Sequence, residues 1–232
     1  MTEDKLAELA VRVSPLSFDL VCLSEVLPKT SGLGSGSPVR SSLSLPGFLP
    51  VWSSVCGRGL VVFVRVGLPF SVLALPSCPD VVSLRVLSSP SLSLLFVYRS
   101  PSASGADSAS LVAAVSAFLA SGGPLVVCGD LNLPSADWLS FSPFSVPPSL
   151  RPLFSCLASA CLVECVGSPT RFRAGDAPSL LDVVLASSPS LVSSVCRSAP
   201  VGRSDHSALS FSVSASVGSV SPSVPRFCWS GG

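Results

Sequence analysis

The stretch from Pro124 to Pro134 constrains the fold more than any other, because an apolar run ends there abruptly at a carboxylate and a carboxamide. The short apolar run from Leu125 to Cys128 lies between Gly and Pro, which predicts a strand buried on both faces. Asp130 and Asn132 then follow on one side of the strand's carboxyl end, with Leu131 pointing into the core. Such a pair indicates either a site for a divalent metal or a phosphate, or an Asx turn that only closes the strand.

The rest of the chain alternates strand-like and helix-like segments, which predicts an α/β fold in a single domain. We expect helices over 2–13, 111–120 and 150–161, and strands over 18–24, 60–66, 72–75, 81–87, 92–97, 180–185 and 208–213, whereas 162–166 is either a short strand or the end of the preceding helix. The domain is expected to span residues 1–213. Residues 214–232, rich in Ser, Val and Pro, are expected to form a disordered tail.

Charge and hydropathy exclude some classes of protein. The formal net charge of +1, with 12% charged residues, argues neither for nor against nucleic acid. The uncharged interval from Ser108 to Gly129 is broken by Gly122, Gly123 and Pro124, so neither piece is long enough to span a membrane. The charged N-terminus lacks a secretory signal, and nine cysteines with a single histidine favour free thiols over a zinc site. We therefore expect a nuclear or cytoplasmic protein.

Chemically useful side chains are scarce in this sequence, yet they gather where strands end. Four acids, the only histidine and the only tyrosine lie at strand exits or inside strands: Glu25, Asp130, Asp182, Asp205, His206 and Tyr98. Because such exits converge on one edge of a layered α/β fold, these residues and Asn132 can form one pocket. Carboxylates suit Mg²⁺, and a buried Asp182 needs a fixed partner, for which the imidazole is suited. Such a pocket suits phosphodiester hydrolysis, although a solvated Glu25 and a half-buried Tyr98 would also explain their positions.

The motifs also have an order that resembles the endonuclease/exonuclease/phosphatase superfamily, in particular the endonuclease domain of non-LTR retrotransposons. The matching segments are 18–25, 57–65, 97–101, 127–134, 169–171, 181–185 and 204–206, the last being Ser-Asp-His. The resemblance covers about Lys5 to Val213. It implies a four-layer α/β sandwich, in which two packed mixed sheets are flanked by helices.

The same resemblance implies a role for each catalytic residue and a Mg²⁺ or Mn²⁺ cofactor. Glu25 would be the main metal ligand, assisted by Asp205. Asp130 would activate or position the attacking water. His206, oriented by Asp182, would stabilise charge that develops on the phosphoryl group.

Substrate contacts are implied in the same way. Tyr98 and Asn132 would touch the scissile phosphate. Further substrate-binding residues would be Arg99, Thr170, Arg171 and Ser204.

The implied activity is that of a DNA endonuclease that nicks target DNA and leaves a 3′-OH primer for retrotransposition, with a reverse transcriptase domain encoded downstream. Two alternatives have the same fold: an inactive domain derived from a retroelement, and a phosphatase acting on a small phosphoester. The loops 31–38 and 172–179 would decide the substrate. The family begins with a strand that carries an Asn, and we expect that strand to be missing ahead of Thr2.

Overall fold

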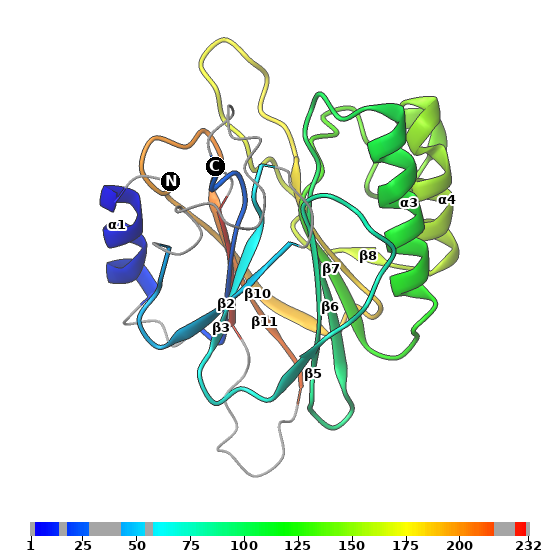
Figure 1. Ribbon diagram of the computed structural model, residues 1–232. Coiled ribbons are helices and arrows are strands. Elements are labelled where there is room, and N and C mark those ends of the chain that lie inside the picture. The colour runs from blue at the N-terminus through cyan, green and yellow to red at the C-terminus, as the bar shows by residue number, and fades with distance from the viewer. Residues whose placement is uncertain (1–2, 14–17, 28–42, 54–57, 216–225, 231–232) are drawn as a thin grey trace.

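The structure is a computed structural model, and it describes residues 3–13, 18–27, 43–53, 58–215 and 226–230. Thr2, the first residue of the expected helix over 2–13, and the 31–38 loop lie outside these residues. Two six-stranded sheets face each other, with helix α1 on the outer face of one and helices α3 and α4 on the outer face of the other (Figure 1). The expected four-layer α/β sandwich with two mixed sheets is confirmed.

The first sheet, sheet A, combines strands from both ends of the chain. Its spatial order is β10 (Val192–Ser198), β11 (Ala208–Val213), β12 (Arg226–Ser230), β1 (Leu20–Leu23), β3 (Val61–Arg65) and β2 (Phe48–Trp52). β12 runs parallel to β1 and antiparallel to β11, and the other pairs are antiparallel. Pro50 lies in β2 at the sheet's edge, where a missing N–H is tolerated.

The second sheet, sheet B, comes from the middle of the chain. Its order is β4 (Phe70–Val72), β5 (Val81–Val86), β6 (Leu92–Tyr98), β7 (Leu125–Asp130), β9 (Asp182–Ala186) and β8 (Val163–Glu164). β6 and β7 are parallel and are connected through α3 (Gly105–Leu119), as a parallel pair requires.

Strand residues alternate between two cores, which explains why the central strands are apolar throughout. In β7, Val126 and Cys128 face the core between the sheets, whereas Leu125 and Val127 face α3 and α4 (Arg151–Ser159). In β1, Leu20 and Cys22 enter the same inter-sheet core, and its other residues face α1 (Glu3–Val13). The prediction that Leu125 to Cys128 is a strand buried on both faces is therefore confirmed.

The helices begin where local sequence allows their first turn to be capped. α3 begins six residues before the expected position of 111, because Ser104 and Asp107 form a reciprocal capping box at its N-terminus. α4 tolerates Pro152 in its first turn. Two short 3₁₀ helices, η2 (Pro143–Ser145) and η3 (Pro148–Leu150), precede it. Within the described residues, no helix combines the length and the apolar character that crossing a membrane requires.

The structure differs from the sequence expectation at the C-terminal segment. Instead of belonging wholly to a disordered tail, Arg226–Ser230 forms β12 in the interior of sheet A, between β11 and β1. Without it, the facing edges of β1 and β11 would each present unpaired backbone groups, which are costly to bury. Strands β2 and β10 were also not expected, because Pro50 in one and a run of serines in the other weaken the strand pattern.

Candidate active site

Three site residues are neighbours across the ends of three adjacent strands. Tyr98 closes β6, Asp130 closes β7 and Asp182 opens β9, and the register pairs Tyr98 with Asp130 and Asp130 with Asp182. All three are at most 4% exposed. Strand register alone therefore brings a phenol and two carboxylates side by side.

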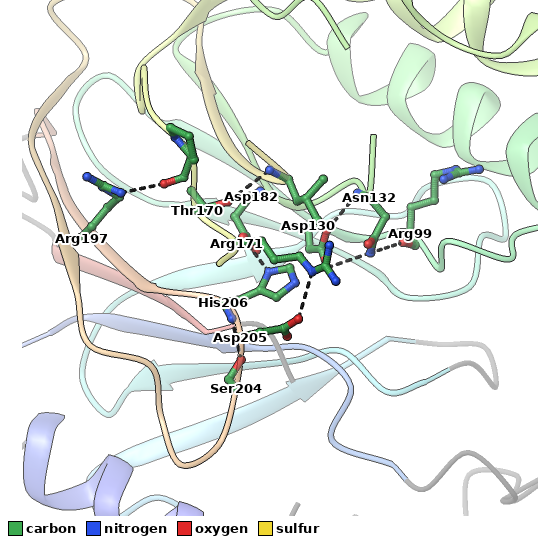
Figure 2. Close-up of polar contacts among 12 residues, drawn as sticks. Arg99, Asp130, Asn132, Thr170, Arg171, Asp182, Arg197, Ser204, Asp205 and His206 are labelled. Atoms are coloured by element: carbon green, nitrogen blue, oxygen red, sulfur yellow. Dashed lines mark hydrogen bonds and ion pairs between the residues drawn. The ribbon is translucent and has the colours of Figure 1, made fainter. Parts of the chain in front are cut away.

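Asp130 and Asn132 form the turn that the sequence predicts. The backbone N–H of Asn132 donates to Asp130 Oδ1 over 2.9 Å, and Asn132 Nδ2 donates to Asp130 Oδ2 over 2.8 Å (Figure 2). Gly129 is needed before them, since its φ is +143° and a Cβ there would lie 1.9 Å from the Val97 carbonyl oxygen. The segment is thus an Asx turn and also part of the buried acidic site, so the two interpretations of this motif do not exclude each other.

Asp182 has the fixed partner that its burial predicts. Its Oδ2 lies 2.8 Å from His206 Nδ1, and the carboxylate is fully buried. Thr170 Oγ1 accepts hydrogen bonds from the backbone N–H groups of Leu181 (3.1 Å) and Asp182 (3.0 Å) and so fixes the backbone at the start of β9. The Ser207 N–H donates to the Thr170 carbonyl over 2.8 Å, which ties the histidine loop to the same segment.

A second part of the site is formed around Glu25, just beyond the end of β1. Tyr98 donates its hydroxyl hydrogen to Glu25 Oε1, and Arg58 Nη2 lies 3.3 Å from Glu25 Oε2. Glu25 has a φ of +55°, an uncommon conformation for a residue other than glycine. The Tyr98 hydroxyl therefore connects sheet B to the carboxylate that sheet A contributes.

The electrostatics of the cluster reflect its burial and its accumulated negative charge. Burial raises the pKa of Asp130 well above the ordinary value, and the charges of Asp182 and Glu25 add to that rise. Burial would lower the pKa of His206, but the hydrogen bond and charge of Asp182 outweigh it and raise that pKa to about 9. Burial and the hydrogen bond to Glu25 raise the pKa of Tyr98. These pKa shifts favour the protonated form of the His206 imidazole and the neutral form of the Tyr98 hydroxyl.

The cluster fits a divalent cation. Ligand atoms of Asp130, Asp182 and His206 lie within 4.8 Å of one another. Burial is the largest cause of the raised pKa of Asp130, and the charges of Asp182 and Glu25, which add to the rise, are ones that a cation would offset. Carboxylate oxygens of Asp130 and Glu25 are ligands of the kind that Mg²⁺ and Mn²⁺ prefer. His206 Nδ1 engages Asp182, so the imidazole is held by a carboxylate and is not counted among these metal ligands.

The predicted residues Asp205 and Arg171 lie beside this cluster and pair with each other. Arg171 Nε donates to Asp205 Oδ2 over 3.0 Å, and a second nitrogen reaches Asp176 Oδ2 at 3.2 Å. Although burial opposes it, the hydrogen bond from Arg171 keeps the pKa of Asp205 low. Asp205 lies outside the compact group of ligand atoms formed by Asp130, Asp182 and His206, and its assisting role at the metal remains a prediction.

The other predicted substrate residues differ in how far they reach the site. Thr170 is fully buried, and its Oγ1 atom accepts a hydrogen bond from the backbone N–H of Asp182, so it positions Asp182. Ser204 Oγ accepts from the His206 N–H over 3.1 Å. The Arg99 carbonyl accepts from Asn132 Nδ2 over 2.9 Å, whereas its guanidinium extends away from His206 in Figure 2.

Sequence reasoning did not single out Arg58. It lies in the segment 57–65 that carries part of the family resemblance, but its contact with Glu25 joins residues 33 positions apart in the chain and has no local signature. A strand-exit pattern could not have found it, because Arg58 precedes its strand instead of following it.

Comparison with known proteins agrees with this fold. The family model described as "Endonuclease/Exonuclease/phosphatase family" matches residues 2–206. The endonuclease domain of TRAS1, a telomere-specific non-LTR retrotransposon, is 17% identical with a TM-score of 0.66, covering 91% of this chain and 93% of that one. The 3′ phosphatase NExo from Neisseria, bound to a product DNA hairpin, is 18% identical with a TM-score of 0.61, covering 91% and 95%.

A third similar structure is the AP endonuclease LMAP from Leishmania major, which is 15% identical with a TM-score of 0.65, covering 88% of this chain and 82% of that one. At these identities the likeness concerns the fold. A search of the curated proteins found no match.

Proposed function

The chain belongs to the Endonuclease/Exonuclease/phosphatase family, and we propose that it is a divalent-metal-dependent DNA endonuclease that nicks its target to leave a 3′-OH primer for reverse transcription. The observation that carries this proposal is the buried group of Asp130, Asp182 and His206, joined to Asn132 and to the Tyr98–Glu25 contact. The endonuclease domain of a non-LTR retrotransposon is among the similar structures, which favours this substrate over others of the same fold. A reverse transcriptase encoded downstream is the partner we propose.

Asp130 is suited to orient a water for in-line attack on phosphorus. Its two oxygens are fixed by Asn132, so the carboxylate does not rotate as the water approaches. Because Asn132 lies beside Asp130, it can contact the phosphate that this water attacks. When bound at Glu25 and Asp130, a divalent cation would polarise the phosphoryl oxygen and neutralise part of its charge.

His206 supplies a positive charge, opposite to the negative charge of the phosphoryl group. The hydrogen bond to Asp182 fixes the ring and keeps it protonated at neutral pH, so a cation faces the phosphoryl group while charge accumulates there. The neutral Tyr98 hydroxyl holds Glu25 through a hydrogen bond and so orients the proposed metal ligand. The Thr170 hydroxyl oxygen keeps Asp182 in place by accepting a hydrogen bond from its backbone N–H.

The test is a nicking assay on supercoiled plasmid DNA with Mg²⁺ and, as a control, with EDTA. We expect metal-dependent conversion to open circles, with ends that a DNA polymerase extends without further treatment. Glu25→Gln keeps the shape of the side chain and removes its charge, so it should abolish nicking while the fold is retained. No nicking by the wild-type protein under any divalent cation would contradict the proposal.

The same preparation separates the alternatives that share this fold. Release of phosphate from a 3′-phosphorylated oligonucleotide without nicking would assign a phosphatase. Binding of DNA with neither reaction would indicate an inactive domain.

A further inference from the structure

Arg58 is a cationic residue of the active site to which the roles above give no task. It lies just before β3, and its Nη2 atom is 3.3 Å from Glu25 Oε2. Its side chain is 23% exposed and that of Glu25 is 25% exposed, so both are largely shielded from water. The pair shares Glu25 with the hydroxyl of Tyr98, which occupies the other carboxylate oxygen.

The guanidinium has more donors than the structure satisfies. Its Nε and Nη1 atoms are both buried, and neither has a hydrogen-bond partner among the described residues. Leaving buried N–H donors of a charged group unpaired is costly, so a partner that accepts several hydrogen bonds is expected there. The planar fork of an arginine matches two oxygens of a phosphate better than it matches any single carbonyl.

The loop that carries Arg58 is fixed in place before any ligand arrives. The backbone N–H groups of Arg58 and Gly59 donate to the two carboxylate oxygens of Asp80, each over 2.9 Å. Gly59 has a φ of +83°, and a Cβ on it would lie 2.6 Å from Leu27 Cγ, so this turn needs glycine. The Asp80 carbonyl in turn accepts from the N–H of Tyr98. The arginine is therefore positioned by the same strand end that positions Tyr98.

Glu25 is also the proposed metal ligand, which creates a conflict that a phosphate resolves. A divalent cation beside Glu25 would be repelled by the guanidinium a few ångströms away. A phosphodiester between the two cations would attract both. We propose that Arg58 is a phosphate-binding residue of the active site, which opposes metal binding while no phosphate is present and favours it once the DNA backbone is bound. This inference rests on the proposed function, because it assigns Arg58 to the same substrate.

The consequence is that metal and substrate should bind with positive coupling through Arg58. The experiment measures Mn²⁺ binding by titration calorimetry, with and without a short DNA duplex. The His206→Ala background slows cleavage, and a denaturing gel run after each titration verifies that the duplex is uncut. Arg58→Gln removes the charge, and Arg58→Lys keeps the charge but loses the fork. Arg85→Gln is the matched control, because Arg85 lies on β5 opposite Ser93, at the far end of β6 from Tyr98.

In the absence of DNA we expect Arg58→Gln to bind Mn²⁺ roughly three- to tenfold more tightly than the parent, because a neighbouring positive charge is lost. With DNA the advantage should disappear, and the coupling factor between Mn²⁺ and DNA should fall toward one. Arg58→Lys should retain the weak metal affinity of the parent but bind DNA roughly tenfold less tightly. Arg85→Gln should match the parent in both titrations.

Two results would overturn the inference: Mn²⁺ affinity in Arg58→Gln no higher than in Arg85→Gln, or undiminished coupling. If the melting curve shows that Arg58→Gln is poorly folded, Arg58→Lys becomes the deciding variant. Unchanged DNA affinity in Arg58→Lys would then refute phosphate binding by Arg58. A wild-type protein that shows the coupling but nicks no plasmid would contradict the proposed endonuclease and leave the role of Arg58 supported. A protein that binds neither Mn²⁺ nor DNA overturns both.

Discussion

The two halves of the site are built in different ways. Sheet B contributes Tyr98, Asp130 and Asp182 from adjacent strands in direct register, so their spacing follows from backbone hydrogen bonds between neighbours. Sheet A contributes Glu25 from the segment after β1 and His206 from the segment before β11, which are separated in the sheet by β12. The first half is fixed locally, whereas the second depends on how sheet A is completed and packed against sheet B.

Because of this difference, substitutions in the two sheets should affect activity in different ways. Contacts across the sheets, namely Tyr98 to Glu25 and Asp182 to His206, join the half that is fixed by strand register to the half that depends on the packing of sheet A. Substitutions in sheet A should therefore affect activity by changing the distances across these two contacts. Substitutions in sheet B should affect activity through the chemical group that is removed. The following predictions test this division, beginning with the largest expected effect.

The largest effect is expected from Cys228→Pro in β12. Proline removes one ladder hydrogen bond from a strand paired on both sides and introduces a clash, so we expect a loss of about 3 kcal/mol or more in the free energy of unfolding. Denaturant titration measures it, and Cys228→Ser, which keeps the backbone N–H, is the control for loss of the thiol. A proline variant as stable as the serine variant would show that β12 does not hold sheet A together.

The contact between the halves is tested by His206→Ala and Asp182→Asn. Each should lower the nicking rate by on the order of a hundredfold, because the carboxylate and the imidazole act as one unit. The double variant should be scarcely slower than the poorer single one. Multiplicative losses in this double-mutant cycle would mean that the two residues act independently.

A smaller effect, confined to sheet B, is expected from Thr170→Val. The substitution keeps the volume of the side chain but leaves the N–H groups of Leu181 and Asp182 unpaired in the interior, which should cost about 2 kcal/mol of stability. Thr170→Ser retains the hydroxyl and is the control. Equal melting temperatures for the valine and serine variants would rule out this role.

The smallest effect is expected in the pH dependence of stability of the metal-free protein. The pKa of His206 is raised from 6.5 to about 9, so the folded state holds this proton more tightly than the unfolded state. Its contribution is complete below about pH 6.5 and is lost as the pH rises toward 9. The wild type should therefore melt a few degrees above His206→Gln at pH 6, and the gap should shrink by pH 9.5. A gap that stays constant would mean that His206 is not protonated through Asp182.

The strands of sheet B that carry Tyr98, Asp130 and Asp182 are predicted well, because an apolar run that contains or ends at a polar residue is a local signal. An apolar run that stops at Asp130 specifies a buried strand with a carboxylate at its end, and the structure confirms that strand. The expected partner for the buried Asp182 is found in His206. Trp138, which follows the Asp130 turn, packs against Phe141 and Phe154.

Structural features that depend on residues distant in the chain could not be predicted from the sequence. Arg58 meets Glu25 only after β1 and β3 have paired, and no spacing in the chain encodes that contact. Segment 226–230 lies beyond Ser- and Pro-rich sequence, so its composition indicates disorder although the gap between β1 and β11 provides hydrogen bonds on both sides. Phosphate contacts for Arg171 and Ser204 remain predictions, because their side chains are engaged by neighbours in this structure.

The position of β12 has a consequence for the order in which the protein acquires its shape during translation. Strands β1, β2 and β3 leave the ribosome early, yet one edge of β1 receives its neighbour only when residues 226–230 have been synthesised. At about 5–20 residues per second, the edge of β1 stays open for on the order of ten seconds or more. An open, apolar strand edge invites pairing with other chains. Chaperone demand and aggregation should therefore be highest before the last strand emerges, and slowing translation near its codons should increase both.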